Sequence, residues 1–524
     1  MSLIISALIL FSSYTFANSS FIDICDKAEL GDAIVEILNA QHCNRVPIRD
    51  FNGLRSLDIR DKIIHNIPEN AFLGMNLRSI SLAGNQVKTI HPKAFSGLRY
   101  LEELNLNDNS ITSLNSNQFS ELSSLKSLNL SLNRINTIES KAFAGLKSVT
   151  KISLNSNKIQ VLENGLFAGL DDSPLAIINL ADNRIEKIEI EAFLGLRNTR
   201  NRWLKVILSS NQNLPLNFSL YSGLEKVTDL NLVNTNISEL DKVNFSPFKR
   251  LETLILDLNP FTKLPAMSFV HLKELTRLEI KNGKVMDIDR DAFTGLSKLN
   301  FLSLKKNELE NIKHGWFTGL DSLKRLELTD QKIDIIEDEA FKELKNLETL
   351  WLQNNKLTKI QRDSLRGLRK LKKLRLDHNK INYIAMHAFN DFKLTLENLT
   401  LRRNDLHRIS HGQFAGFKNS KHFDLGLNKI THIEYGSFFE SNFVLLDLEH
   451  NLLTKLGSNM FIGMTVRDIL RISDNQIKEI MPGTFADQTN IKYLFLANNI
   501  VQTINRSEVK LSPSCSVDGV RVLP

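Results

Sequence analysis

The sequence predicts an α/β solenoid of about 19 repeats, coiled around a concave parallel β-sheet, with irregular or short helical segments on the convex side. Three periodic features predict this fold. An asparagine recurs at a spacing of mostly 24 residues, alternating leucines precede it, and a phenylalanine follows it ten residues later. A period of about 20 to 50 residues is typical of repeat proteins. A chain of 524 residues would otherwise suggest several separate domains, but the period favours a single repeat architecture.

The repeat is clearest in LRSISLAGNQVKTIHPKAFSGL, residues 77–98, where Asn85 begins a regular series of asparagines. The next members are Asn109, Asn133 and Asn157. Asparagine occupies 15 of the 19 equivalent positions, and the exceptions are Lys62, Thr235, Gly283 and Gln331. The downstream phenylalanine is almost as regular, with Tyr221 and Leu365 as its substitutes.

Each repeat predicts one strand, because alternating leucines such as Leu104 and Leu106 point to one face of an extended chain. A single strand cannot bury this face alone, whereas stacked copies form a continuous sheet over a shared core. The chain must turn after each strand, and a buried Asn amide can satisfy the backbone groups left inside that turn. The phenylalanines are expected to stack as a spine on the convex side.

The first 17 residues, MSLIISALILFSSYTFA, hold no charged side chain, contain an apolar run too short to span a bilayer and end on small residues. We interpret residues 1–17 as a cleaved signal peptide. An N-terminal cap at 18–53, the solenoid at 54–505 and a short C-terminal cap or tail at 506–524 are expected to follow. No later stretch reaches about 20 consecutive apolar residues. The expected product is secreted and extracellular, without a membrane span.

Three cysteines, Cys25, Cys43 and Cys515, would then lie in an oxidising compartment and are expected to pair. We predict a disulfide between Cys25 and Cys43, which flank a short amphipathic segment; closing this loop stabilises the cap by about 3 kcal/mol. Cys515 is left over. Two interpretations stay open for it: an intermolecular disulfide that gives a dimer or a hetero-complex, or a thiol buried under the last coil.

The unit LxxLxLxxNxIxxIxxxAFxGLxx resembles the leucine-rich repeats of secreted and cell-surface animal proteins such as Toll-receptor ectodomains, chaoptin, Slit and the acid-labile subunit. The resemblance covers roughly residues 54–505 and implies a leucine-rich-repeat horseshoe. The ends depart from these families, because a four-cysteine cap usually precedes such repeats and a cysteine-rich cap usually follows them. The resemblance is specific for the fold and not for a function.

A net charge of +7 favours acidic partners, and outward positions from the tenth repeat onward are mostly basic. We predict a partner-binding stripe on the concave face, which His378 also borders. Its candidate residues are Arg277, Lys281, Lys305, Lys306, Arg325, Trp351, Lys373, Arg375, Arg402 and Arg403. An acidic protein surface or a sulfated glycan would bind there, with Trp351 as an anchor, and charge reversal at Arg402 and Arg403 is expected to weaken partner capture. The alternative is an ordinary solvated sheet face, since Glu279, Glu327, Asp330 and Asp377 interleave and neutralise it.

Seven acceptor sequences for N-glycosylation accompany the predicted secretion. They lie at Asn18, Asn129, Asn217, Asn236, Asn244, Asn398 and Asn505. Insertions lengthen two repeats, DDSP at 171–174 and the basic RNTRNR at 197–202. The second is a partner contact, a protease-sensitive loop or a tolerated surface insertion.

The sequence contains no nucleophile elbow, phosphate-binding glycine loop, paired-cysteine metal site or HExxH, so neither a metal nor a cofactor is expected. The function we predict is non-catalytic protein binding through the concave face, by a secreted recognition or adaptor protein, with innate immunity as one setting. An extracellular-matrix or cell-adhesion component is the alternative, and an enzyme is a remote one. Secretion makes a nucleic-acid ligand unexpected.

Overall fold

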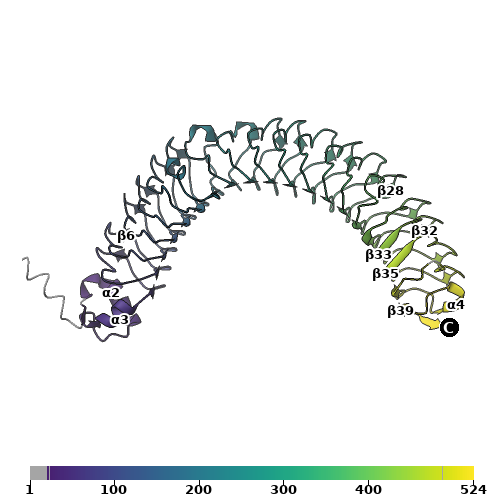
Figure 1. The fold of residues 1–524 in the computed structure, drawn as a ribbon, viewed down its shortest axis with the longest axis horizontal. Helices are drawn as coiled ribbons and strands as arrows, with labels where there is room; N and C mark the ends of the chain where they lie inside the picture. The colour runs from purple at the N-terminus through teal and green to yellow at the C-terminus, as the bar shows by residue number, and fades with distance from the viewer. Residues whose placement is uncertain (1–20, 23, 487) are drawn as a thin grey trace, which may run out of the picture. The chain divides into compact units, whose positions relative to one another are not determined.

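The computed structural model describes residues 21–22, 24–486 and 488–524. The predicted signal peptide at 1–17 and the acceptor Asn18 lie outside the described residues. The chain divides into two compact units: unit 1 comprises Met1–Asn236 and Asn244–Leu251, and unit 2 comprises Ile237–Val243 and Glu252–Pro524. Both units are parallel-sheet solenoids with little helix, as the repeat predicts, and in each the short strands follow one edge of successive coils (Figure 1).

The N-terminal cap covers the first coil of unit 1. Strand β1 (Phe21–Ile22) pairs antiparallel with β2 (Val46–Pro47), and the cap contains η1 (Cys25–Lys27), α2 (Ala28–Ile37) and α3 (Ile48–Gly53). Helix α2 buries Leu30, Ala33 and Ile34 on one face. The disulfide between Cys25 and Cys43 is present, which confirms the predicted pair.

The main sheet of unit 1 contains one strand from each of eight repeats, and each described pair is parallel. These strands are β3 (Ser56–Asp58), β5 (Ser79–Ser81), β7 (Glu103–Asn105), β9 (Ser127–Asn129), β11 (Lys151–Ser153), β13 (Ile177–Asn179), β15 (Lys205–Ile207) and β16 (Asp229–Asn231). Two-residue strands form a second, discontinuous ladder: β4 (Asn66–Ile67), β6 (Thr89–Ile90), β8 (Ser113–Leu114), β10 (Thr137–Ile138), β12 (Val161–Leu162) and β14 (Lys187–Ile188). The loop side carries η2 (Leu194–Leu196) and η3 (Phe218–Leu220).

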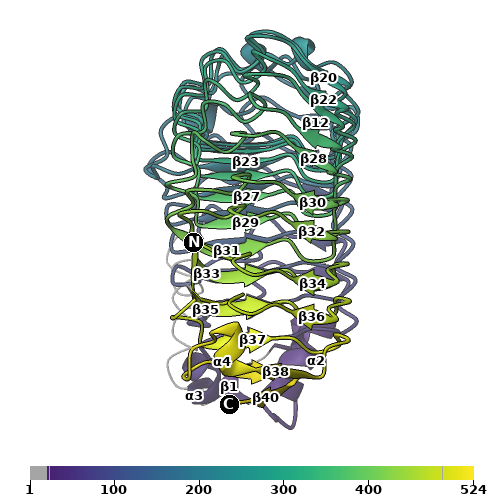
Figure 2. The same ribbon diagram turned by 90° about the vertical axis from the view of Figure 1, so that its right-hand side faces the viewer.

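Unit 2 repeats the same plan. Its main sheet runs through β17 (Thr253–Ile255), β19 (Arg277–Glu279), β21 (Phe301–Ser303), β23 (Arg325–Glu327), β25 (Thr349–Trp351), β27 (Lys373–Arg375), β29 (Asn398–Thr400), β31 (Ser420–Asp424), β33 (Asn442–Asp447), β35 (Thr465–Arg471), β37 (Tyr493–Phe495) and β39 (Ser516–Asp518). Figure 2 shows many of these strands as parallel rungs, with the second ladder beside them.

The second ladder of unit 2 consists of β18 (Lys263–Leu264), β20 (Asp287–Ile288), β22 (Asn311–Ile312), β24 (Ile335–Ile336), β26 (Lys359–Ile360), β28 (Tyr383–Ile384), β30 (Arg408–Ile409), β32 (His432–Ile433), β34 (Lys455–Leu456), β36 (Glu479–Ile480), β38 (Thr503–Asn505) and β40 (Arg521–Leu523). The unit also holds η4 (Leu240–Lys242) and α4 (Arg506–Val509). Among the described residues, no helix combines the length and the apolar character needed to cross a membrane.

The recurring asparagines bind the backbone in the way the sequence predicts. Asn133 donates from Nδ2 to the carbonyl of Leu106 in the preceding coil (2.9 Å) and to that of Leu130 in its own coil (3.2 Å), while its Oδ1 accepts from the N–H of Ile111 (3.0 Å). Gln331 makes the equivalent bonds to Leu304 and Leu309 with its longer side chain. Each asparagine therefore joins two coils.

The phenylalanine spine is also present. In unit 1, Phe72 begins a stack that runs to Phe193 with ring centroids 6.0 to 6.3 Å apart. In unit 2, Phe269 begins a similar stack that runs to Phe341. The buried Leu365 replaces the ring in the next coil.

The C-terminal segment adds a further rung that the sequence pattern did not predict. Strand β39 pairs with β37, and β40 pairs with β38, so residues 506–524 continue the sheet. Cys515 directly precedes β39 and is only 3% exposed. Burial raises the pKa of its thiol. This arrangement matches the buried-thiol interpretation; an intermolecular disulfide would require the last coil to open.

Candidate functional site

The ten residues of the predicted stripe all lie in unit 2, on successive coils of its sheet. Arg277, Arg325, Trp351, Lys373 and Arg375 are on strands, and the remaining five lie in the turns that follow strands. None of the ten is buried. The pleat explains this placement, because the leucines between them face the core and leave the alternate side chains on the opposite face.

Arginines and aromatic rings alternate across five successive strands, β19 to β27, as an arginine–aromatic ladder (Arg277, Phe301, Arg325, Trp351 and Arg375). The guanidinium carbon of Arg277 lies 3.9 Å from the centroid of the Phe301 ring. That of Arg325 lies 5.5 Å from Phe301 and 3.8 Å from Trp351, and that of Arg375 lies 5.8 Å from Trp351. Cation–π attraction and stacking therefore hold both rings and all three guanidinium groups in place.

Each arginine of the ladder also binds a carboxylate two residues further along its own chain. Arg277 pairs with Glu279 (2.5 Å), Arg325 with Glu327 (2.5 Å) and Arg375 with Asp377 (3.1 Å). All three carboxylates are buried. Burial acts to raise the pKa of Glu279, but hydrogen bonds from Lys281 and Arg277 outweigh it and leave this pKa below its usual value. The ladder is therefore largely neutralised, as the alternative interpretation of the stripe expects.

Arg402 occupies a similar position and is less available than its sequence context indicates. Its guanidinium lies 3.7 Å from Asp424 and 3.9 Å from Asp447, and its side chain is only 31% exposed. Gly426 leaves room for this guanidinium, because a Cβ at that position would collide with Nη1 of Arg402. Burial raises the pKa of Asp424. The positive charge of Arg402 is therefore partly balanced within the chain, and its role in partner binding stays a prediction.

Other members of the stripe are more exposed. Arg403 lies 3.3 Å from Nε2 of His378, and Lys305 pairs with Asp330 at 3.5 Å. Lys306 and Lys373 are exposed and make no ion pair with any described residue. Free cations are thus scattered along the face and do not form a continuous positive stripe.

A shallow depression of about 390 Å³ lies beside Trp351. Its other lining residues include Lys373, Arg375, Asn398 and His422. Asn398 belongs to an acceptor sequence for N-glycosylation, so a glycan attached there would lie at the depression itself.

The other glycosylation candidates differ in accessibility. Asn217, Asn236 and Asn244 are exposed, whereas Asn129 and Asn505 are partly buried. The Oδ1 atom of Asn129 accepts hydrogen bonds from Ser131, and that of Asn505 accepts from the Glu508 N–H as the N-cap of α4. The presence of glycans at these positions stays a prediction.

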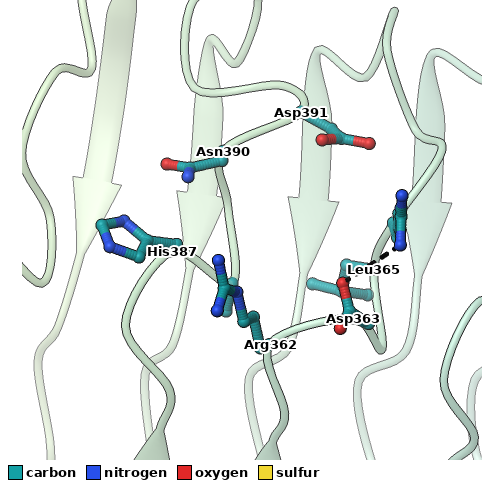
Figure 3. A pocket seen from close by; sticks show the side chains of 8 residues that line it. Arg362, Asp363, Leu365, His387, Asn390 and Asp391 are labelled. Carbon is teal, nitrogen blue, oxygen red and sulfur yellow. Dashed lines mark ion pairs between the residues drawn. The ribbon is translucent and has the colours of Figure 1, made fainter.

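A second hollow, of about 150 Å³, lies among the loops that follow β26 and β28 (Figure 3). Arg362, His387 and Asn390 are among the residues that line it, and Arg366 pairs with Asp363 of the same loop at 3.7 Å. It is small and polar, and it contains none of the predicted stripe residues. Within the described residues, no group of three or more His, Cys, Asp or Glu side chains is arranged to hold a metal ion. The non-enzymatic role stays a prediction.

The sequence matches two families of repeat. Residues 65–200 match the BspA type leucine rich repeat region in six copies. Residues 273–333, 322–381 and 395–453 match the leucine rich repeat. The chain is therefore built of leucine-rich repeats in both units. No curated protein matches it.

Solved structures show the same fold at low sequence identity. A chain of the Drosophila Toll–Spatzle complex is 18% identical with a TM-score of 0.65, and the match covers 95% of this chain and 65% of that chain. A chain of the mouse RP105/MD-1 complex is 24% identical with a TM-score of 0.58, covering 89% and 78%. The TLR13–ssRNA13 complex matches at 23% identity and a TM-score of 0.50, covering 91% and 74%. The last of these is a complex with RNA, and the expectation that this chain binds no nucleic acid stays a prediction.

Proposed function

We propose that this protein is a secreted, non-catalytic recognition protein, and that a partner protein binds to the sheet face of unit 2 around the arginine–aromatic ladder. The observation that carries the proposal is the ladder itself, with Trp351 at the edge of a depression. Tryptophan and arginine are the residues that most often dominate the binding energy of protein interfaces.

Pre-organisation supports this role. The guanidinium groups of Arg277, Arg325 and Arg375 are held by rings and by buried carboxylates, so binding immobilises few additional side-chain rotamers. Five rungs at the usual strand spacing extend about 20 Å, which is compatible with one side of a protein interface of standard size.

The solved structures with the same fold include the Toll–Spatzle complex, described as a hub in development and innate immunity, and the RP105/MD-1 complex. By this likeness we extend the proposal to a recognition role in innate immunity. Secretion rests on the signal-peptide pattern of residues 1–17. N-terminal sequencing of the exported protein would test it, because an intact Met1 would contradict cleavage.

The decisive experiment compares wild type with Trp351→Ala in affinity purification from the extracellular fluid, followed by measurement of the affinity for any partner recovered. Trp203→Ala is the matched control, because Trp203 is an exposed indole in unit 1. We expect Trp351→Ala to weaken binding by about tenfold or more and Trp203→Ala to leave it unchanged. The proposal would be contradicted if Trp351→Ala and wild type captured the partner equally well while circular dichroism showed that both proteins are folded.

Salt dependence adds a second criterion. Because the arginines already have carboxylate partners, we expect the affinity to change by only about threefold between about 0.05 and 0.3 M NaCl. A much steeper loss would indicate that free charge drives binding, as for the acidic partner predicted from the sequence.

A further inference from the structure

A row of cations runs along the flank of unit 2, just before the main strands. Its members, Lys345, Arg369, Lys393 and Lys418, occupy equivalent positions in four successive repeats and define the flank row. The adjacent backbone fixes the coils next to one another: Lys372 N–H donates to the carbonyl of Glu348 (2.9 Å), and further bonds of this kind follow in the next two coils (2.8 and 2.7 Å). One cation per coil therefore repeats at roughly the spacing of strands, about 4.8 Å.

The flank carries an excess of positive charge. Residues 343–348, 367–373, 391–397 and 416–421 contain eight Lys or Arg and four Asp or Glu. Two of the carboxylates are occupied by lysines outside the row, in the pairs Glu348–Lys372 (2.8 Å) and Glu397–Lys421 (2.7 Å). The hydrogen bond from Lys372 holds the pKa of Glu348 below its usual value, and that from Lys421 does the same for Glu397.

The row itself is left largely without internal counter-charges. Lys345 and Arg369 are exposed, Lys393 is partly exposed, and among the described residues none of the three makes an ion pair. Lys418 alone pairs with a carboxylate, that of Glu440 at 3.2 Å. The flank row therefore differs from the arginine–aromatic ladder, where every guanidinium is neutralised.

The row leads into a groove of about 270 Å³, whose lining includes Lys418, Lys421, Arg467 and Val444. Strands β31, β33 and β35 are longer than the other main strands, as Figure 2 shows. The pairing of β33 with β35 is irregular between Phe443 and Leu445, which leaves Val444 exposed at the groove. Arg467 makes no ion pair with any described residue and adds a cation to the groove two coils beyond Lys418, whereas Asn442 occupies the row position in the coil between them.

We infer that the flank row and this groove bind a linear sulfated polysaccharide laid along the solenoid axis of unit 2. Sulfate groups spaced along a chain suit regularly spaced ammonium and guanidinium groups, because each cation can form charge-assisted hydrogen bonds with them. Single-stranded nucleic acid is less suitable. Proteins bind it with aromatic rings on which bases stack, and the ring of the groove, Phe443, is fully buried.

The test uses defined heparin fragments as the probe and measures their affinity at several NaCl concentrations. The row variant carries Lys345→Ala, Arg369→Ala and Lys393→Ala together. The control variant carries Arg134→Ala, Lys141→Ala and Lys147→Ala, which remove the same charges from exposed positions of unit 1 that make no described ion pair. We expect the row variant to lose about tenfold or more in affinity at about 0.15 M NaCl and the control to lose less than about twofold.

Several outcomes would overturn the inference. Equal losses in the two variants would show that only the net charge matters, and unchanged heparin binding by the row variant would exclude the row. Tighter binding of a single-stranded oligonucleotide, with the same dependence on the row, would assign the surface to nucleic acid. Trp351→Ala should leave heparin affinity unchanged, which separates this surface from the proposed protein-binding face.

Discussion

Replacement of Asn133 by alanine tests how the recurring asparagine stabilises the solenoid. The Asn133 side chain is 7% exposed and joins the Ile111 N–H to the carbonyls of Leu106, Leu130 and Ser131. After substitution the carbonyl of Leu106 keeps a bond from Asn109, but the Ile111 N–H is left buried without this acceptor. An orphaned buried amide costs about 1–3 kcal/mol and each lost neutral hydrogen bond about 1 kcal/mol, so we expect a loss of about 2–4 kcal/mol in unfolding free energy.

The control is Asn136→Ala, three residues further along. Asn136 is exposed and accepts a hydrogen bond only from the adjacent Thr137 side chain, so its loss should cost less than about 0.5 kcal/mol. Asn133→Asp should be at least as harmful as Asn133→Ala, because it places a second carboxylate oxygen against three carbonyls. Urea unfolding followed by circular dichroism measures all three variants, and hydrogen exchange measures protection of the Ile111 amide. Equal shifts for Asn133→Ala and Asn136→Ala, or unchanged protection of Ile111, would refute the reasoning.

Three further predictions concern unit 2. Gly426→Ala should shift the flexible end of the Arg402 side chain away from Asp424 at a cost of less than about 1 kcal/mol in unfolding free energy, and a loss of several kcal/mol in urea unfolding would show that this side chain cannot move aside. Cys515 should react slowly with iodoacetamide in the native protein and rapidly in denaturant, and equal rates would show that the last coil is open. Because burial raises the pKa of Asp424 in the folded state, protonation favours folding, and this contribution is lost as the pH rises through the folded pKa. Asp424→Asn should therefore gain stability relative to wild type from about pH 4 to about pH 7 in urea titrations, and a relative loss would reverse the assignment.

The sequence predicted the features that follow from repetition. The positions of Asn133 and of the stacked phenylalanines were readable because each repeat must solve the same packing problem. The outward positions of Arg277 and Trp351 followed from the alternation of leucines in the same way. The disulfide between Cys25 and Cys43 was readable from composition and placement.

The interactions between neighbouring outward side chains could not be predicted from the sequence. Arg325 and Glu327 could both have pointed into solvent, and their pairing depends on rotamers set by Phe301 and Trp351 on adjacent strands. Phe301 itself went unnoticed, although it occupies the same repeat position as Arg277 and Arg325. The flank row becomes evident only when neighbouring glutamates are seen to be occupied by other lysines.

The final rung was missed for a different reason. Strand β39, with the sequence SVD, lacks the leucine pattern and contributes only one apolar residue, Val517, to the end of the unit. A terminal coil has one neighbour, so its composition is less constrained than that of an interior coil.

The asparagine contacts also have a direction along the chain. Oδ1 and Nδ2 of each asparagine reach back to the preceding coil, as Asn499 does to Ile477 and Ile472. A turn that is followed by one of these asparagines is therefore completed by the next repeat, whereas Gly283 has no side chain to do so. During synthesis, the newest coil of such a pair carries an open amide and an open carbonyl, and these close only after roughly one more repeat has emerged. Assembly from the N-terminus would then advance one coil at a time, with the unfinished end as the point most exposed to misfolding.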